Sequence, residues 1–336
     1  MKINLKFLLL WLLILPSCVE EPVRYPNTWQ GNFEALWNTI DQRYCYLDYK
    51  HVNWDSIHLV YKNRVSIVSD EMVFFDVMGQ MLNELKDGHV NLFSDFDVSR
   101  YWSWFQNYLP NFQSELIYSP RYLGTNYRIS GGMRYKKIDG GNIGYIYLGE
   151  FTSTFTKSNL IYIFDYFSTC QGLIIDVRNN GGGYLSQAET LASCFFKERT
   201  LTGYMSHKIG DGHSDFSKPL AMYTEKNDSM HWDKPVAILT NRSSYSATNA
   251  FVSSMNYAPR ATIIGDRTGG GGGLPLSNEL PNGWLVRFSA VPMYDASMQH
   301  IEWGLDPDIK VDMRSSDEVS GYDTIIETAV AFLKGL

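Results

Sequence analysis

The chain has 336 residues, of which 44% are hydrophobic, 15% aromatic and 19% charged. A length of this order allows two domains, and the composition excludes collagen, coiled coils and disordered chains. The net charge of −7 and the lack of a lysine- or arginine-rich cluster exclude a typical nucleic-acid-binding surface.

The first residues have the pattern of an export signal. Lys2 and Lys6 precede an apolar run from Phe7 to Leu15. This run is too short to span a bilayer, which needs about 20 residues. We therefore expect the mature protein to leave the cytosol.

The end of this run resembles the bacterial lipobox, because its sequence is Leu15-Pro16-Ser17-Cys18. The resemblance implies that Cys18 becomes the lipidated first residue of the mature chain. We expect residues 1–18 to be a lipoprotein signal peptide, residues 19–26 to be a linker, and the protein to be held by a lipid anchor in the cell envelope. A plain secretory signal cut nearby is the alternative.

The cysteines and histidines do not predict a metal site. Besides Cys18 the chain has Cys45, Cys170 and Cys194, without CxxC spacing. Cys170 and Cys194 lie among apolar residues and are expected to be buried thiols. The seven histidines form no HExxH or paired-ligand pattern. We expect neither a metal nor another cofactor.

Residues 27–90 show helical periodicity. Apolar residues recur at spacings of three and four at Phe33, Leu36, Trp37 and Ile40, and again at Phe74, Val77, Met78, Met81, Leu82 and Leu85. This pattern predicts a small helical N-terminal domain. Residues 91–140 are aromatic and show no periodicity, and we expect them to be a connecting segment.

From residue 141 to residue 336, the chain alternates between strand and helix patterns. Buried strands are expected at Ile143–Tyr147, Leu173–Val177 and Val236–Leu239, with helical patterns following at 185–195 and 247–255 and a closing helix at 325–333. This order predicts an α/β domain.

Small hydroxyl residues fill the turn at 241–249, between a predicted strand and a predicted helix. A serine at the start of that helix would be exposed beside free backbone N–H groups and the positive end of the helix dipole. Such a place suits a nucleophile whose product is an oxyanion. The alternative is that Ser243, Ser244 and Ser246 only cap the helix.

Two further segments carry polar groups that suit catalysis. Gly181–Gly183 follow a buried strand, and such glycines bring N–H groups close to a ligand. The spacing fits neither a dinucleotide-binding motif nor a P-loop, so an oxyanion hole is the better interpretation. His89 follows a turn at the end of the helical segment and titrates in the range of a general base, although a lone histidine is more often structural.

Taken together, the motifs resemble peptidase family S41, the tail-specific or C-terminal processing proteases. The resemblance rests on Asp87-Gly88-His89, the segment GLIIDVRNNGGG at 172–183, SYSATN at 244–249, IIGDRTG at 263–269 and GLDPD at 304–308. It implies a ClpP- or crotonase-like α/β core that carries a serine peptidase site. It also implies a helical N-terminal domain before this core.

The resemblance implies a role for each matching residue. Ser246 matches the family nucleophile, Ala247 would supply one oxyanion N–H, and a glycine of the Gly181–Gly183 run, with Gly182 as our choice, would supply the other. Processing proteases have a lysine as general base where this chain has Gly271.

The tricorn-like branch of the family uses a histidine and a glutamate instead, and this chain has His89 and Glu302 in the matching regions. We expect Ser246, His89 and Glu302 to form a triad in which Glu302 orients the imidazole. The tricorn-like site has a serine where Gly88 stands here.

The expected reaction is hydrolysis of a peptide bond through an acyl-enzyme, by an endopeptidase or a C-terminal processing peptidase. The spacing between His89 and Ile143 is too short for a PDZ domain. Since the family lysine is missing, a protein that binds a peptide or apolar ligand without cleaving it is the alternative. The sequence does not predict the oligomeric state.

Overall fold

The chain is described by a computed structural model that covers residues 24–336. The predicted signal peptide, Cys18 and the first part of the predicted linker lie outside these residues. Within residues 24–336, no helix is both long and apolar enough to cross a membrane.

Three helices form the N-terminal part, namely α1 (Trp29–Arg43), α2 (Trp54–Val65) and α3 (Glu71–Asn83). Each helix begins at a side-chain cap, because the side chains of Thr28, Asn53 and Asp70 accept a hydrogen bond from a backbone N–H of the first turn. The apolar residues predicted to repeat at helical spacing are buried, apart from the half-buried Trp37, and all but Leu85, which follows α3, lie in these helices. The predicted helical N-terminal part is therefore confirmed.

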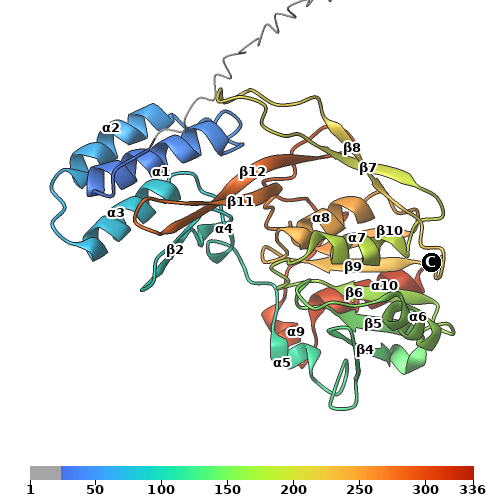
Figure 1. The fold of residues 1–336 in the computed structure, drawn as a ribbon. Helices are drawn as coiled ribbons and strands as arrows, with labels where there is room; N and C mark the ends of the chain where they lie inside the picture. Colours follow the sequence, from blue (N-terminus) through green and yellow to red (C-terminus); the bar gives the residue numbers. More distant parts are fainter. Residues whose placement is uncertain (1–23) are drawn as a thin grey trace, which may run out of the picture.

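The helices pack on a sheet with the strand order β2-β1-β12-β7-β8, in which β11 also pairs with β12 (Figure 1). The bounds of these strands are β1 (Asn91–Phe93), β2 (Val98–Arg100), β7 (Thr200–Met205), β8 (Leu220–Thr224), β11 (Gly273–Glu279) and β12 (Leu285–Asp295). Trp284, Val286 and Phe288 complete the apolar core of the helices. The helical part thus shares its core with strands from near the other end of the chain.

The central sheet has the order β13-β10-β9-β6-β5-β4-β3. Its strands are β3 (Arg128–Ser130), β4 (Met133–Ile138), β5 (Ile143–Tyr147), β6 (Gly172–Asp176), β9 (Val236–Thr240), β10 (Ala261–Gly265) and β13 (Ile309–Lys310). The strands from β13 to β5 are parallel, whereas β4 and β3 are antiparallel to their neighbours. The predicted α/β core is confirmed.

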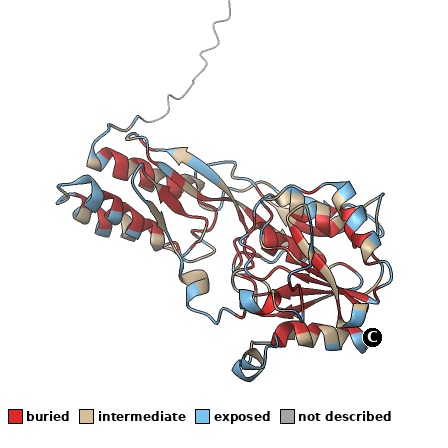
Figure 2. Cartoon of the chain, turned by 90° about the horizontal axis from the view of Figure 1, so that it is seen from below, coloured by how far each residue is buried: buried red, intermediate tan, exposed pale blue. Residues whose placement is uncertain are grey.

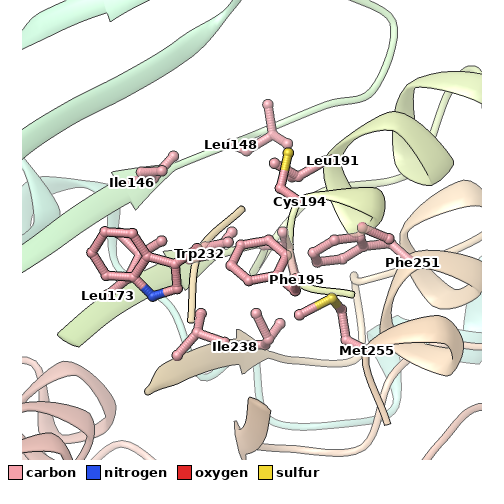
Figure 3. Close-up of a cluster of buried hydrophobic side chains, with 14 of the residues drawn as sticks. Ile146, Leu148, Leu173, Leu191, Cys194, Phe195, Trp232, Ile238, Phe251 and Met255 are labelled. Carbon is pink, nitrogen blue, oxygen red and sulfur yellow. The ribbon is translucent and has the colours of Figure 1, made fainter. Parts of the chain in front are cut away.

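Helices cover both faces of the central sheet, and Figure 2 shows most of this sheet in red. Its inner strands β6 and β9 are buried throughout, whereas the outer strands β3 and β13 are not. Leu173 and Ile175 of β6 point to the core formed with α6 (Lys157–Tyr166), α7 (Leu185–Ser193) and α8 (Ala247–Met255) (Figure 3). Ile174 points to the opposite core, which includes α10 (Thr324–Lys334). Because side chains on both faces of the sheet are buried in apolar cores, polar groups lie at the ends of the strands.

Residues 91–140 differ from the predicted connecting segment. They contain β1, β2, β3 and β4, the short helices α4 (Ser103–Gln106) and α5 (Ser114–Ile117), and the start of a 3₁₀ helix at Asp139–Gly141. The last short helix, α9, lies at Ser315–Val319. Three of the four strands span only three residues, and alternation over so few residues does not produce a readable period.

Candidate active site

Ser246 lies on a tight turn between β9 and α8. Its backbone has φ 60° and ψ −121°, a conformation that is rare for a residue with a side chain. The Ser246 N–H donates to the Gly270 carbonyl at 2.9 Å, and the Tyr245 N–H donates to the Asn180 carbonyl at 3.0 Å. The turn is therefore held from both sides and presents the serine at the start of a helix, where a nucleophile is well placed.

His89 reaches this serine from the other sheet. Its Nε2 lies 2.9 Å from Ser246 Oγ. His89 stands between α3 and β1, and its backbone N–H donates to Asp87 Oδ1 at 2.8 Å. Asp87 is fixed in turn, because its Oδ2 accepts hydrogen bonds from Tyr44 Oη and Ser289 Oγ, each at 2.9 Å. The two residues predicted to act together are thus within hydrogen-bond reach.

The surroundings of His89 keep its imidazole neutral near pH 7. The residue is 4% exposed, and this burial lowers its pKa to about 4. Asp87 acts to raise the pKa, whereas the positive charges of Arg287 and Lys50 lower it further. A neutral imidazole has an unprotonated nitrogen, so Nε2 can accept the hydroxyl proton of Ser246.

The glycine run is positioned by a buried arginine. Arg178 donates to both oxygens of Asp176, at 2.9 and 2.6 Å, and its Nη1 lies 2.9 Å from Asp323 Oδ2. All three side chains are fully buried. Such a bidentate pair has a fixed geometry, so it holds the end of β6 and the turn that leads to Gly181–Gly183.

Gly182 lies directly against the nucleophile. A Cβ atom built at Gly182 would be 2.8 Å from Ser246 Cβ and 2.9 Å from Ala247 N, so only glycine fits there. However, the Gly182 N–H donates to Asn180 Oδ1 at 3.0 Å. Among the described residues, the N–H groups of Ala247 and Gly183 donate to no acceptor. The expected oxyanion donor Ala247 is free, whereas the N–H of Gly182 is engaged.

Glu302 is not placed as the triad interpretation expected. Its Oε1 lies 2.6 Å from Lys50 Nζ, and its Oε2 accepts a hydrogen bond from Gly272 N at 2.9 Å. No hydrogen bond joins Glu302 to His89, and the buried Nδ1 of His89 has no hydrogen-bond partner among residues 24–336. The expectation that Glu302 directly orients the imidazole is therefore wrong for this structure, because Lys50 and Gly272 hold the carboxylate.

Lys50 occupies a buried position between two carboxylates. Its Nζ is 3.4 Å from Asp87 Oδ2 as well as 2.6 Å from Glu302, and it lies 4.7 Å from the centre of the Trp303 ring. Burial acts to lower the Lys50 pKa, but Asp87 and Glu302 together raise it. Burial raises the pKa of Glu302 to about 7, with Lys50 opposing this shift and Asp87 adding to it. One ammonium group thus connects Asp87, which supports His89, with Glu302, which supports the glycine loop at Gly269–Gly273.

Tyr245 explains why this chain has Gly271 in place of the lysine of processing proteases and Gly88 in place of the serine of the tricorn-like site. At Gly271, which has φ 77°, a Cβ atom would lie 2.4 Å from Tyr245 Cζ, so the ring fills the space where a longer side chain would begin. At Gly88, a Cβ atom would lie 2.6 Å from Trp104 Nε1 and 2.9 Å from Tyr245 Oη. Trp104 stacks on Tyr245 with ring centres 4.1 Å apart. This aromatic pair leaves no room for the lysine or for the serine.

Ser246 and His89 open onto a cleft of about 580 Å³. Its walls come from both sheets and include aromatic side chains, two arginines and the glycine run, namely Tyr101, Trp102, Trp104, Arg100, Arg287 and Gly181–Gly183. A smaller hollow of about 80 Å³, lined by Leu274, Met293 and Ile301, also borders Ser246. An extended peptide segment can lie in such a cleft with one apolar side chain in the hollow.

The sequence analysis did not identify Lys50, Trp104, Tyr245 or Arg287. Tyr245 stands next to the predicted nucleophile, so an aromatic residue inside a motif of small residues was a usable signal. Arg287 is the one charged residue in the mainly apolar strand pattern at 285–291, which is a second usable signal. Lys50 and Trp104 lie in segments without a recognisable motif, and only the fold brings them to the site.

Comparison with protein families gives two matches. The profile described as peptidase family S41 matches residues 142–311, about half of the chain. The profile described as the tricorn protease C1 domain matches residues 25–83. The first match contains Ser246 and the glycine run, and the second covers the three N-terminal helices.

Individual proteins agree with these matches. The chain is 27% identical over 192 residues to a carboxy-terminal-processing protease of Bartonella bacilliformis, which covers 55% of this chain and 42% of that protein. The chain thus spans less than half the length of that relative. The crystal structure of a peptidase candidate from Parabacteroides merdae is 49% identical with a TM-score of 0.88, covering 92% of this chain and 97% of that one.

A more distant likeness concerns the fold alone. The crystal structure of mature CPAF has a TM-score of 0.68 at 11% identity and covers 91% of this chain and 96% of that chain.

Proposed function

This chain belongs to peptidase family S41, and from that premise we propose that it is a serine peptidase with Ser246 as nucleophile and His89 as general base. The observation that carries the proposal is the 2.9 Å separation of His89 Nε2 and Ser246 Oγ. A nucleophile and a base at this distance satisfy the geometric requirement for acyl transfer. The same contact favours hydrolysis over a protein that binds without cleaving.

In the proposed reaction, Ser246 Oγ attacks the carbonyl carbon of a peptide bond while His89 Nε2 accepts the hydroxyl proton. His89 then gives this proton to the leaving amine, the C–N bond breaks and an acyl-enzyme remains. Water, deprotonated by His89, attacks the acyl carbon and releases the new carboxyl group and Ser246. Substrate is an extended peptide, cut internally or near its carboxyl end.

The oxyanion would be held by backbone N–H groups next to the nucleophile. Ala247 N–H is free and starts helix α8, whose dipole adds a positive partial charge. We assign the second donor to the Gly181–Gly183 turn. Within it, Gly183 is favoured over Gly182, since the N–H of Gly182 already donates to Asn180.

The role that we propose for Glu302 is indirect positioning. Its carboxylate accepts the Gly272 N–H, and the carbonyl of Gly270, two residues earlier in the same loop, accepts the Ser246 N–H. Glu302 therefore supports the nucleophile from behind the glycine loop. Lys50 joins this support to Asp87, which holds the backbone of His89.

A fluorophosphonate probe tests the proposal, because it phosphonylates an activated serine hydroxyl. Wild-type protein should be labelled, Ser246→Ala should not, and Ser243→Ala should be labelled like the wild type. Ser243 is the matched control, since it lies three residues away on the same turn and its hydroxyl makes no hydrogen bond among the described residues. Unlabelled wild type, or equal labelling of Ser246→Ala, would reject the nucleophile.

The location of the protein is a separate proposal. We infer an extracytoplasmic protein attached to a membrane through a lipid on Cys18, supported by Lys2 and Lys6, the apolar run after them and the lipobox-like segment. Expressed with its signal, the wild type should enter the detergent phase of a Triton X-114 partition, and Cys18→Ala should not. Recovery of the wild type wholly in the aqueous phase would contradict the anchor.

A further inference from the structure

Three neighbouring strands place two arginines, with one strand between them, on the wall of the cleft. Asn91 of β1 pairs with Arg287 of β12 on one side and with Arg100 of β2 on the other, both in antiparallel register. Directly paired residues of adjacent strands project from the same face of a sheet. With a strand spacing of about 4.8 Å, the backbones of the two arginines are roughly 10 Å apart. All three residues line the cleft that contains Ser246 and His89.

Neither arginine has an acidic partner. Among residues 24–336, no carboxylate lies within ion-pair distance of Arg100 or Arg287, and neither guanidinium donates a hydrogen bond. Arg100 is exposed and lies with its guanidinium 5.3 Å from the centre of the Trp102 ring. Arg287 is half-buried, and this burial lowers its pKa, with Tyr245 and Asp87 opposing the shift. Burying part of a guanidinium without a hydrogen-bond partner costs folding free energy, unless a bound ligand supplies that partner.

The charge of the cleft differs from that of the whole protein. The charged side chains that line it are Arg100, Arg287 and the exposed Glu150, while His89 is neutral near pH 7. Its formal charge is therefore +1, in a chain whose net charge is −7. Glu150 pairs with neither arginine, since its only side-chain hydrogen bond among the described residues comes from Ser153 Oγ at 3.3 Å. A positive cleft in an acidic protein attracts anionic groups.

Arg287 also lies close to the reacting atoms. It lines the small apolar hollow beside Ser246 as well as the large cleft. A ligand group on Arg287 therefore shares the cleft and the hollow with a peptide bond presented to Ser246. The planar fork of a guanidinium matches a carboxylate through two parallel hydrogen bonds.

We propose that Arg287, with Arg100 beside it, binds a carboxylate of the peptide substrate next to the bond that Ser246 attacks. This inference rests on the proposed peptidase function and adds the chemistry that selects the substrate. The carboxylate comes either from the carboxyl terminus of the peptide or from an aspartate or glutamate side chain. Both sources present the same anionic group to the arginine pair.

Peptide binding to the Ser246→Ala variant tests the inference without requiring cleavage. Three fluorescent peptides of one apolar sequence are compared by anisotropy at low salt: one with a free carboxyl terminus, one with a terminal amide, and one amidated peptide with an internal glutamate in place of glutamine. A peptide that carries the recognised carboxylate should bind at least tenfold more tightly than the neutral peptide. Preference for the free terminus identifies the α-carboxylate, and preference for the glutamate peptide identifies a side chain.

Substitutions then assign the preference to the arginines. Arg287→Gln in the Ser246→Ala background should bind all three peptides alike, Arg287→Lys should retain part of the preference, and Arg100→Gln should reduce it. Arg128→Gln is the control, because Arg128 lies on β3 outside the cleft, and it should keep the full preference. No preference for any carboxylate, no binding of any peptide, or a preference that survives Arg287→Gln would overturn the inference.

The peptide-binding test and the fluorophosphonate test can fail independently of each other. Fluorophosphonate labelling of the wild type without any carboxylate preference leaves the peptidase and removes the arginine role. A carboxylate preference that depends on Arg287, in a protein that the probe does not label, leaves an anion-binding cleft without the proposed catalysis.

Discussion

His89 Nε2 and Ser246 Oγ lie 2.9 Å apart, although 157 positions of sequence separate the two residues. His89 belongs to the part of the chain that packs around α1–α3, and Ser246 starts a helix of the central α/β core. The proposed base and nucleophile are thus carried by two different apolar cores.

Replacing the proposed base should remove activity without removing the fold. His89→Ala should lower the rate of fluorophosphonate labelling and of peptide hydrolysis by several orders of magnitude, since loss of a base that acts with its nucleophile costs up to roughly a millionfold. His213→Ala is the control, because that histidine is part-exposed, lies away from the cleft and contacts Asp41 through Nε2 at 2.8 Å. Labelling of His89→Ala at the wild-type rate would assign the proton transfer to another group.

The pH dependence of labelling should report the unusual environment of His89. The pKa of about 4 means that the imidazole loses its base function only as the pH falls through about 4. An unperturbed histidine would lose it near pH 6.5. The labelling rate with a small uncharged probe should therefore stay near its maximum at pH 5.5. A midpoint at 6.5 would contradict the buried, neutral imidazole.

A single substitution should move this midpoint in a known direction. The charge of Arg287 lowers the pKa of His89, so Arg287→Gln should raise the midpoint of the acid limb. Arg128→Gln, on the outer strand β3, should leave the midpoint unchanged. The other charged groups that act on His89, Asp87 and Lys50, are intact in both variants.

Substitution of Lys50 should lower the free energy of unfolding more than substitution of Glu302. Lys50→Met leaves the carboxylates of Asp87 and Glu302 buried without a counter-charge, which should cost about 3 to 5 kcal/mol in the free energy of unfolding. Glu302→Gln leaves Lys50 paired with Asp87 and should cost less. Urea denaturation of both variants measures the difference, and the opposite order would contradict the assignment of Lys50 as the shared counter-charge.

The cost of Lys50→Met should also depend on pH. The pKa of Glu302 is raised to about 7 even beside Lys50, and removing that positive charge raises it further. A carboxyl group with a raised pKa in the folded state contributes stability at low pH that is lost as the pH rises through that value. The variant should therefore be closer to wild type at pH 5 than at pH 8, and denaturation curves at these two pH values check the sign.

Gly271, before β11, and Gly283, in the turn between β11 and β12, offer a matched pair of substitutions. Gly271 and Gly283 have similar backbone angles, with φ 77° and 87°, but a Cβ at Gly283 would meet nothing within 4 Å. Gly283→Ala should cost about 1 kcal/mol for the left-handed backbone alone. Gly271→Ala should cost a further 1 to 3 kcal/mol because of the contact with Tyr245. In a Tyr245→Ala background, the two substitutions should cost nearly the same, and an unchanged difference there would rule out the ring as its cause.

Much of the α/β core was predictable from the sequence, because its strands are long enough and buried on both faces. The run Leu173–Val177 is apolar except for Asp176, and most of it lies in β6 (Gly172–Asp176) at the centre of the sheet. The strands within residues 91–140 were missed because β1, β2 and β3 have only three residues each. The union of the N-terminal helices with Trp284, Val286 and Phe288 also has no local signal, since the contact joins opposite ends of the chain.

The site was predictable in part. No local pattern connects His89 with Ser246, and the resemblance of several motifs to one family supplied the pairing. That resemblance placed Glu302 in the region of the site, but its partner is Lys50, an isolated residue in a segment without a motif. The row of Arg100, Asn91 and Arg287 depends on strand register, which the spacing of charged residues along a chain does not determine.

The support of the proposed base depends on strand β12, which comes late in the chain. Ser289 on this strand holds Asp87, and the strand pairs with β1 directly after His89. The support of the proposed base is therefore synthesised about two hundred residues after the base itself. A chain that ended before β12 would contain both Ser246 and His89 but would lack the strand that holds Asp87, so the proposed base would lose its support.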